Sequence, residues 1–294
     1  MLKNAARGRS DLKRKFADRT FSPGAESDIR PERFSIEEAD MQFGQHQLKR
    51  CRYGWMLFSG PFVGKCFELY GEYSESEVSL MRSFVGPGDT AIDIGAYIGD
   101  LTVPMSRFVG DTGRIYAIES HIEHYHLLCA NLALNGIRNV KALNYFVANS
   151  DTVDTAGPWG EFGGVSEVWG TTVVSLDSLA LPACSFIKVD VDGKELEVLR
   201  SGERCLDLHR PVVYFENDVR EASPALLQYL LDREYDIYWH PAPIFDEKNF
   251  FGNPINHWHP KNIVSQMMLG VPKEKDQSDL ALKKVSSQDE WWDF

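Results

Sequence analysis

A glycine turn preceded by an acid is the part of the sequence best suited to chemistry. Asp93 comes just before the turn, and Gly95 and Gly99 stand four residues apart within it. Because glycine has no Cβ, the backbone can approach a ligand closely at Gly95, and the next helix can pack closely at Gly99. The free amides at the start of that helix attract an anionic group, such as the carboxylate of an amino-acid-like cofactor. The turn therefore predicts a cofactor site.

A second acid, Glu119, ends the next apolar run about twenty residues beyond the glycines. A carboxylate there can accept hydrogen bonds from both hydroxyls of a ribose. Nicotinamide dehydrogenases share this arrangement, but their fingerprint is G-x-G-x-x-G, whereas here an acid precedes two glycines four apart. The spacing favours S-adenosylmethionine, a sulfonium cofactor, over a nicotinamide. The alternative without catalysis is an inactive Rossmann-like domain that has the same tight turn.

Carboxylates also gather after two later apolar runs. Asp190 and Asp192 follow one run, and Glu216 and Asp218 follow the next. In sheets of parallel strands, ligands bind outside the carboxyl ends of the strands. These acids are consistent with a base beside an acceptor, with oxygen ligands for Mg²⁺, or with caps of the following helices. A divalent metal is an alternative that we do not expect, and its ligands stay unknown.

Two histidines, His257 and His259, flank Trp258 near the end of the chain. Histidine titrates near neutral pH, so His257 is a candidate base, although packing or a wall of the acceptor pocket is the more ordinary role. The i, i+2 spacing does not define a metal site by itself. Glycines and two tryptophans in residues 150–170 suggest a lid over an acceptor with an apolar or sugar face.

These residues need a framework of alternating strands and helices, and the hydrophobic pattern provides one. Ser74 with Glu77 has the pattern of a capping box at the first helix. The last two strands are joined without a helical pattern, so they should be antiparallel. The expected strands are 90–94, 114–119, 140–148, 186–191, 211–217, 236–240 and 263–269, and the expected helices are 74–85, 100–109, 121–135, 194–201 and 222–233.

Charge and cysteine content narrow the class of protein. Lys and Arg number 31 against 43 Asp and Glu, a net charge of −12, which argues against broad binding to nucleic acid. The five scattered cysteines favour reduced thiols, and no segment resembles a signal peptide or a membrane span, so we expect a cytoplasmic protein. The oligomeric state is open.

The pattern divides the chain into three parts. Residues 1–50 form a polar, basic N-terminal extension that we expect to be partly disordered, residues 51–272 form the catalytic domain, and residues 273–294 form a C-terminal tail. Trp291, Trp292 and Phe294 suggest that this tail either is anchored on the domain or contacts a partner.

From Tyr70 to about Pro272, the order of motifs resembles the FkbM family of methyltransferases. The matching segments are Gly71-Glu72, Gly86-Pro87-Gly88-Asp89, the Asp93–Gly99 turn with Thr102, Ala130-Asn131-Leu132-Ala133-Leu134-Asn135, Ser175-Leu176-Asp177-Ser178-Leu179, Ile187-Lys188-Val189-Asp190-Val191-Asp192-Gly193-Lys194-Glu195 and Val198-Leu199. Two positions depart from the family pattern. Glu119-Ser120 stands for its usual Glu-Pro, and Asp192 stands for the Glu of its usual Asp-Val-Glu-Gly.

The resemblance implies a class I methyltransferase with a Rossmann-like α/β fold: a seven-stranded, mainly parallel sheet with the last strand antiparallel and helices on both faces. It implies that Ala148 and Asn149 border the adenine and that Asp190 lies near the methionine end of S-adenosylmethionine. Tyr97 is consistent with either covering the cofactor or packing. The remaining expected cofactor contacts are Asp93, Gly95, Ala96, Gly99, Thr102, Glu119 and Ser120, and the candidate catalytic residues are Asp192, Asp190 and His257.

We therefore expect in-line transfer of a methyl group from S-adenosylmethionine to a hydroxyl of a small molecule or a sugar. The cofactor already carries an activated methyl group, so alignment and exclusion of water should supply most of the rate. Transfer to nitrogen is the alternative within the same class. A nicotinamide-dependent oxidoreductase and a binding protein without catalysis are less favoured.

Overall fold

A computed structural model describes residues 41–149, 172–261, 263–275 and 280–292. The predicted lid over residues 150–170 lies outside these ranges, and so do residues 1–40 and Phe294. No helix of the described residues is both long and apolar enough to span a membrane.

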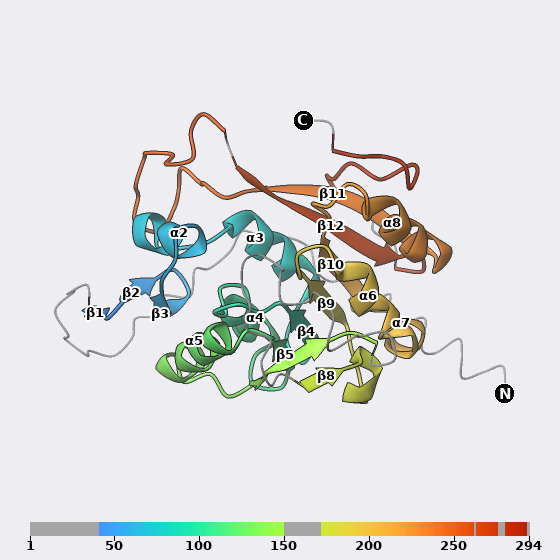
Figure 1. The fold of residues 1–294 in the computed structure, drawn as a ribbon, viewed down its shortest axis with the longest axis horizontal. Helices are drawn as coiled ribbons and strands as arrows, with labels where there is room; N and C mark the ends of the chain where they lie inside the picture. The colour runs from blue at the N-terminus through green and yellow to red at the C-terminus, as the bar shows by residue number, and fades with distance from the viewer. Residues whose placement is uncertain (1–40, 150–171, 262, 276–279, 293–294) are drawn as a thin grey trace. The chain divides into compact units, whose positions relative to one another are not determined.

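A seven-stranded sheet forms the centre of the domain (Figure 1). Its strands, in sheet order, are β11 (Tyr235–Pro243), β12 (Val264–Pro272), β10 (Val212–Glu216), β9 (Phe186–Val189), β4 (Thr90–Ile94), β5 (Arg114–Ile118) and β6 (Val140–Leu143). β12 runs antiparallel to both of its neighbours, and the other pairs are parallel. The predicted sheet, with its antiparallel last strand, is confirmed.

Helices cover both faces of this sheet because alternate residues of each strand point to opposite sides. Ala91 packs in one hydrophobic cluster with residues of α3 (Glu75–Phe84) and α4 (Thr102–Val109), and α5 (Ile122–Leu134) packs against Ala117. Ile92 belongs to the opposite cluster. The helices of that cluster are α6 (Glu195–Arg200), α7 (Glu203–His209) and α8 (Ser223–Asp232).

The third predicted strand, residues 140–148, is two strands. β6 ends at Leu143, and β7 (Tyr145–Val147) pairs instead with β8 (Thr172–Val174), which leads into the 3₁₀ helix η2 (Leu176–Leu179). Asn144 explains the break, since its side-chain amide donates to the carbonyls of Glu119 at 2.8 Å and Ser120 at 3.0 Å. The chain turns at this residue and leaves the main sheet.

A three-stranded sheet precedes the core, and no predicted strand corresponds to it. It consists of β1 (Met41–Phe43), β2 (His46–Cys51) and β3 (Gly54–Phe58), and α2 (Val63–Tyr70) follows it. The free edge of β3 is paired by side chains of α5. Asn131 and Asn135 each accept from and donate to the backbone of Leu57 and Trp55 respectively, at 2.7–3.1 Å.

The predicted capping box at the first long helix is wrong. Ser74 has a left-handed backbone (φ 42°), and its side chain makes no capping hydrogen bond. Glu77 does not reach back to the helix start, because its side chain is buried in the protein with 1% exposure. A residue expected to stabilise a helix end therefore places a carboxylate in the interior.

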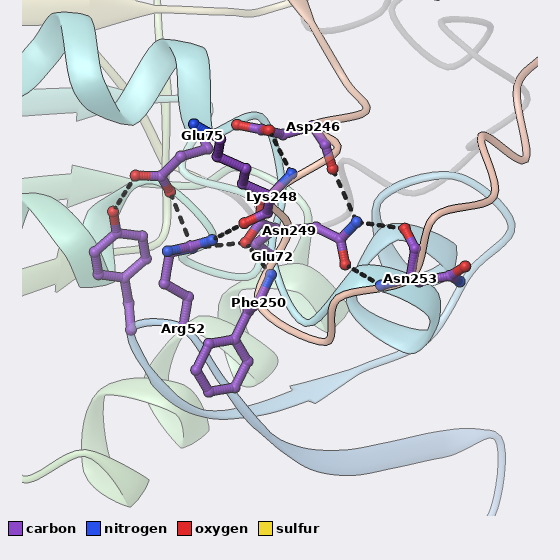
Figure 2. A network of polar contacts seen from close by, with 9 residues as sticks. Arg52, Glu72, Glu75, Asp246, Lys248, Asn249, Phe250 and Asn253 are labelled. Atoms are coloured by element: carbon purple, nitrogen blue, oxygen red, sulfur yellow. Dashed lines mark hydrogen bonds and ion pairs between the residues drawn. The ribbon is translucent and has the colours of Figure 1, made fainter.

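A network of polar contacts fixes the long connection between β11 and β12 (Figure 2). The Arg52 guanidinium donates to the buried Glu72 carboxylate at 2.6 Å and to the Lys248 carbonyl at 2.9 Å. The same Glu72 oxygen accepts from the Phe250 amide at 2.7 Å. The connection is thereby held against the segment that joins α2 and α3.

The C-terminal segment lies along the free edge of β11. The Trp239 amide donates to the Lys283 carbonyl at 2.8 Å, so residues near 283 continue the hydrogen bonding of the sheet. Trp292 packs edge-on against Trp239, with ring centroids 4.5 Å apart, and its indole N–H donates to the Asn217 carbonyl at 2.7 Å. Trp292 is therefore an anchor within the chain.

Candidate cofactor and acceptor site

The glycine turn after β4 brings the ends of two strands into contact. Gly95 has a left-handed backbone (φ 75°), and a Cβ there would lie 1.8 Å from the Asp190 carbonyl oxygen at the end of β9. At Gly99 (φ 89°), a Cβ would lie 2.9 Å from Leu128 of α5. Both glycines are therefore needed for close packing within the protein, and the approach of a ligand to Gly95 stays a prediction.

Two of the expected cofactor contacts hold the turn from behind. Asp93 is fully buried and accepts a 2.5 Å hydrogen bond from the Thr102 hydroxyl. Neither residue lines the pocket described below. Asp93 and Thr102 tie the end of β4 to the start of α4, so they shape the turn.

Glu119 follows β5 and closes the turn from the other side. Its two carboxylate oxygens accept the backbone N–H groups of Tyr97 at 2.8 Å and His121 at 2.7 Å. Burial raises the pKa of Glu119 to about 7, although both hydrogen bonds oppose the rise. A carboxylate has about four lone-pair positions, so this group can still accept ribose hydroxyls.

A pocket of about 460 Å³ opens over the carboxyl ends of β4, β5, β9 and β10. Six of the expected site residues line it: Gly95, Tyr97, Glu119, Ser120, Asp190 and Asp192. The volume lies in the usual range for small-molecule sites. The structure therefore brings these six residues together around one pocket.

The other expected residues do not line this pocket. Ala96 and Ala148 are buried, and Gly99 packs on Leu128, as described above. Asn149 is the last described residue before the gap and is also outside the lining. His257 is exposed; its backbone N–H donates to the Tyr70 hydroxyl, and its ring contacts Trp258.

Lys188, to which the sequence analysis gave no role, is the centre of the site. Its ammonium group is 3% exposed, donates to the Gly95 carbonyl at 2.9 Å, and lies 3.3 Å from Asp93 and 3.4 Å from Asp190. The other residues of β9, Phe186, Ile187 and Val189, are apolar and buried. A charged residue inside such an apolar run is the sequence signal that could have identified Lys188.

The acids at the far side of the pocket differ in their expected charge. Burial and the adjacent Asp190 raise the pKa of Glu216 to about 11, so Glu216 is a neutral acid at neutral pH. Partial desolvation, followed by Asp190, raises the pKa of Asp192. Asp192 also has a left-handed backbone (φ 51°), a conformation that non-glycine residues adopt mainly where a site requires it.

Aromatic and imidazole rings form the rest of the wall, and of these the sequence analysis considered Tyr97 but not His124 or Phe62. Tyr97 packs on His124 at 4.3 Å between ring centroids, and burial lowers the pKa of His124 to about 4, so its ring is neutral. Phe62, which also lines the pocket, packs on Trp258 at 5.0 Å. The connection held by Arg52 therefore supports the pocket from outside.

S-adenosylmethionine fits the groups that are present. The turn at Gly95 leaves no space for a side chain, Glu119 offers acceptors for a ribose, and the pocket continues past both toward Asp190 and Asp192. Within the described parts of the chain, no group of three or more His, Cys, Asp or Glu side chains is arranged to hold a metal ion.

The order of strands in the sheet and the glycine turn after β4 are those of a class I S-adenosylmethionine-dependent methyltransferase. Residues 93–237 match the model of the methyltransferase FkbM domain. No curated protein sequence is similar enough to count as a match.

Several solved structures resemble the chain at low identity. Precorrin-6y C5,15-methyltransferase from Geobacter metallireducens is 18% identical, with 67% of this chain and 86% of that chain covered and a TM-score of 0.46. Methyltransferase FkbM from Methylobacillus flagellatus is 16% identical, with 66% and 50% covered and a TM-score of 0.45. An S-adenosylmethionine-dependent O-methyltransferase from Thermotoga maritima is 11% identical, with 82% and 88% covered and a TM-score of 0.46.

Proposed function

We propose that this methyltransferase transfers the methyl group to a hydroxyl of a small molecule or a sugar. The observation that carries the proposal is the position of Asp192. It lines the pocket beyond the turn at Gly95, and no hydrogen bond or ion pair of the described residues occupies its carboxylate. An alcohol needs such a base, because its proton must leave as the oxygen attacks.

When bound, the cofactor supplies a methyl group on a positively charged sulfur. The turn at Gly95 would hold its methionine part and Glu119 its ribose, and Asp190 would lie between the cofactor and the acceptor. Asp190 already forms an ion pair with Lys188 at 3.4 Å, so its carboxylate is engaged. No ion pair with Asp192 is formed by the described residues, so Asp192 would orient the acceptor hydroxyl and accept its proton.

The size and walls of the pocket support a small or ring-shaped acceptor. A volume of about 460 Å³ must contain the cofactor as well as the reacting part of the acceptor. Phe62, Tyr73, Tyr145 and Phe146 line it, and flat aromatic faces suit the apolar face of a sugar or another ring.

An acceptor screen with methyl-labelled S-adenosylmethionine tests the proposal. With a cognate alcohol, Asp192→Asn should keep cofactor affinity but lose about 10²–10⁴-fold in turnover, the usual range for general base assistance. Asp218→Asn, which removes a nearby acid outside the pocket lining, is the matched control.

Three results would redirect the proposal. Parental turnover by Asp192→Asn would remove Asp192 as the base, and His257 would be tested next. Loss of turnover on chelation, with recovery on adding Mg²⁺, would favour a metal site. Methylation of amines alone would favour N-methylation.

A further inference from the structure

The Lys188 ammonium group has more carboxylate neighbours than its single positive charge can balance. Asp93 and Asp190 lie 3.3 Å and 3.4 Å from it, and Glu77 and Asp100 also act on its charge. Four carboxylates against one ammonium group leave an excess of three negative charges when all are ionised. Because an uncompensated buried charge is costly, the cluster favours either protons or a further cation.

Glu77 is a second, independent sign that the cluster has more negative charge than it balances. Both of its oxygens are buried, and within the described residues neither has a hydrogen bond of good geometry, although the Ser74 and Ser265 hydroxyls lie close enough to lower its pKa. Burial raises the pKa of Glu77 to about 7, and Asp190 adds to the rise. The groups that face it are Asp190 and Lys188 of β9, Tyr214 of β10, Ser265 of β12, and Ser74 and Tyr73 before α3.

Asp100 connects the cluster to the pocket, which it lines directly after the glycine turn. Burial raises its pKa to about 7, while Lys188 opposes the rise. The groups that face Asp100 are Lys188 and Asp190 of β9, Asp93 of β4, Tyr97 of the turn, Tyr73, and Cys66 of α2. Glu77 and Asp100 can therefore both change charge near neutral pH.

We propose that Glu77 and Asp100 make this pocket select S-adenosylmethionine over S-adenosylhomocysteine, because the sulfonium supplies the positive charge that the cluster around Lys188 lacks. The inference rests on the proposed function, since it takes this pocket to be the cofactor site. The two molecules share adenosine and amino-acid groups and differ in the methyl group and its charge. After transfer, the neutral thioether no longer compensates the acids, which promotes release of the product.

Proton linkage predicts the direction in which pH changes the affinity for S-adenosylmethionine. A bound cation favours the ionised form of Glu77 and Asp100, so binding of S-adenosylmethionine releases the protons that they hold below about pH 7. Its affinity should therefore fall as pH is lowered from 8 to 6, by up to about tenfold per pH unit for each coupled group. S-adenosylhomocysteine should not show this part of the loss, whereas any effect of Glu119 should be common to both.

Calorimetric titration of the full chain at pH 6, 7 and 8 measures this difference and needs no acceptor. S-adenosylmethionine should bind more tightly than S-adenosylhomocysteine at pH 8, and the ratio should shrink toward pH 6. Sinefungin, in which an amine replaces the methylated sulfur, should follow S-adenosylmethionine. Titrations at pH 6 in two buffers of different ionisation enthalpy should show more protons released with the cationic ligands.

Charge-neutral variants assign the effect to the two acids. Glu77→Gln and Asp100→Asn should each reduce the affinity ratio by about three- to thirtyfold at pH 8 while leaving S-adenosylhomocysteine affinity within about twofold. Glu123→Gln removes one charge from the exposed face of α5 near the pocket, so it controls for net charge and should leave the ratio unchanged.

The outcomes separate this proposal from the function on which it rests. If neither nucleoside binds, the cofactor site itself is wrong. If both bind and their ratio is near one at every pH in the parent protein, charge selection is wrong while the methyltransferase site stands. That comparison needs no variant, so misfolding of Glu77→Gln would not rescue the proposal.

Discussion

The Lys188 ammonium group donates a 2.9 Å hydrogen bond to the Gly95 carbonyl, and this bond joins the middle of β9 to the turn after β4. The same ammonium group lies between Asp93 and Asp190. One buried cation thus sets the backbone of the cofactor turn and the position of an acid in the pocket. A change at Lys188 should therefore affect folding and cofactor binding together.

Lys188→Met should destabilise the protein by about 3–5 kcal/mol, because it leaves buried carboxylates without their cation. Urea denaturation without ligand measures this loss. Lys65→Met, which removes an ammonium group from the surface of α2, should change stability by less than about 0.5 kcal/mol. Equal stability of the two variants would mean that the acids at Lys188 are protonated in the folded protein.

Gly95→Ala should abolish measurable S-adenosylmethionine binding and also destabilise the fold. The new Cβ would lie 1.8 Å from the Asp190 carbonyl oxygen, which is a backbone atom, so the end of β4 or β9 has to move. Gly136→Ala is the control, since Gly136 also has a left-handed backbone (φ 62°) but no atom within 4 Å of a Cβ. It should cost only about 1 kcal/mol of strain and keep binding. Calorimetric titration and thermal melting of both variants check this.

Without ligand, the protein should lose stability as pH rises from 6 to 8. Burial raises the pKa values of Glu77, Asp100 and Glu119 to about 7, above those of ordinary carboxyl groups. The folded state therefore binds more protons than the unfolded state in this range, and the free energy of unfolding falls with pH. The slope should reach up to about 1.4 kcal/mol per pH unit for each group.

Urea denaturation at pH 6, 7 and 8 measures that slope, and Glu77→Gln should make it shallower. Saturating S-adenosylmethionine should also make it shallower if its charge compensates the acids. A free energy of unfolding that rises with pH over this range would contradict the raised pKa values.

Trp292→Ala should destabilise the protein by about 3–5 kcal/mol, as expected when a buried aromatic side chain is truncated. The change removes the packing on Trp239 and the 2.7 Å hydrogen bond to the Asn217 carbonyl. Trp291→Ala, at a less buried neighbour, should cost clearly less. If the two variants melted at the same temperature, the C-terminal segment would not be anchored through Trp292.

The sequence was sufficient to predict the main sheet because each of its strands is a short apolar run between turn signals. It failed at Asn144, where side-chain hydrogen bonds to two distant carbonyls end a strand that the apolar pattern continues. The sequence analysis also failed to predict β1–β3. These strands mix polar and apolar residues, and they are held by pairing with one another and with side chains of α5. Such pairings depend on tertiary contacts that local periodicity does not encode.

In the candidate site, too, some residues could be predicted from the sequence and others could not. Gly95 and Glu119 could be placed because a turn and a strand end determine where their groups lie. Lys188, Glu77 and Asp100 could not, because their importance comes from one another's charge across three segments of the chain. Glu77 is the clearest example, since its spacing from Ser74 is that of a capping box, yet its side chain is buried beside Lys188 and Asp190.

Asn131 and Asn135 stand one helical turn apart on α5, and their amides meet alternate residues of β3, Leu57 and Trp55. Two helix residues thus imitate the repeat of a neighbouring strand, which closes the edge of the hairpin to pairing with another chain. The match holds in only one register, because a shift of one residue along β3 would present side chains of the opposite face. Insertions or deletions in the hairpin should therefore be tolerated at Gly44, in the turn before β2, and not between Cys51 and Phe58.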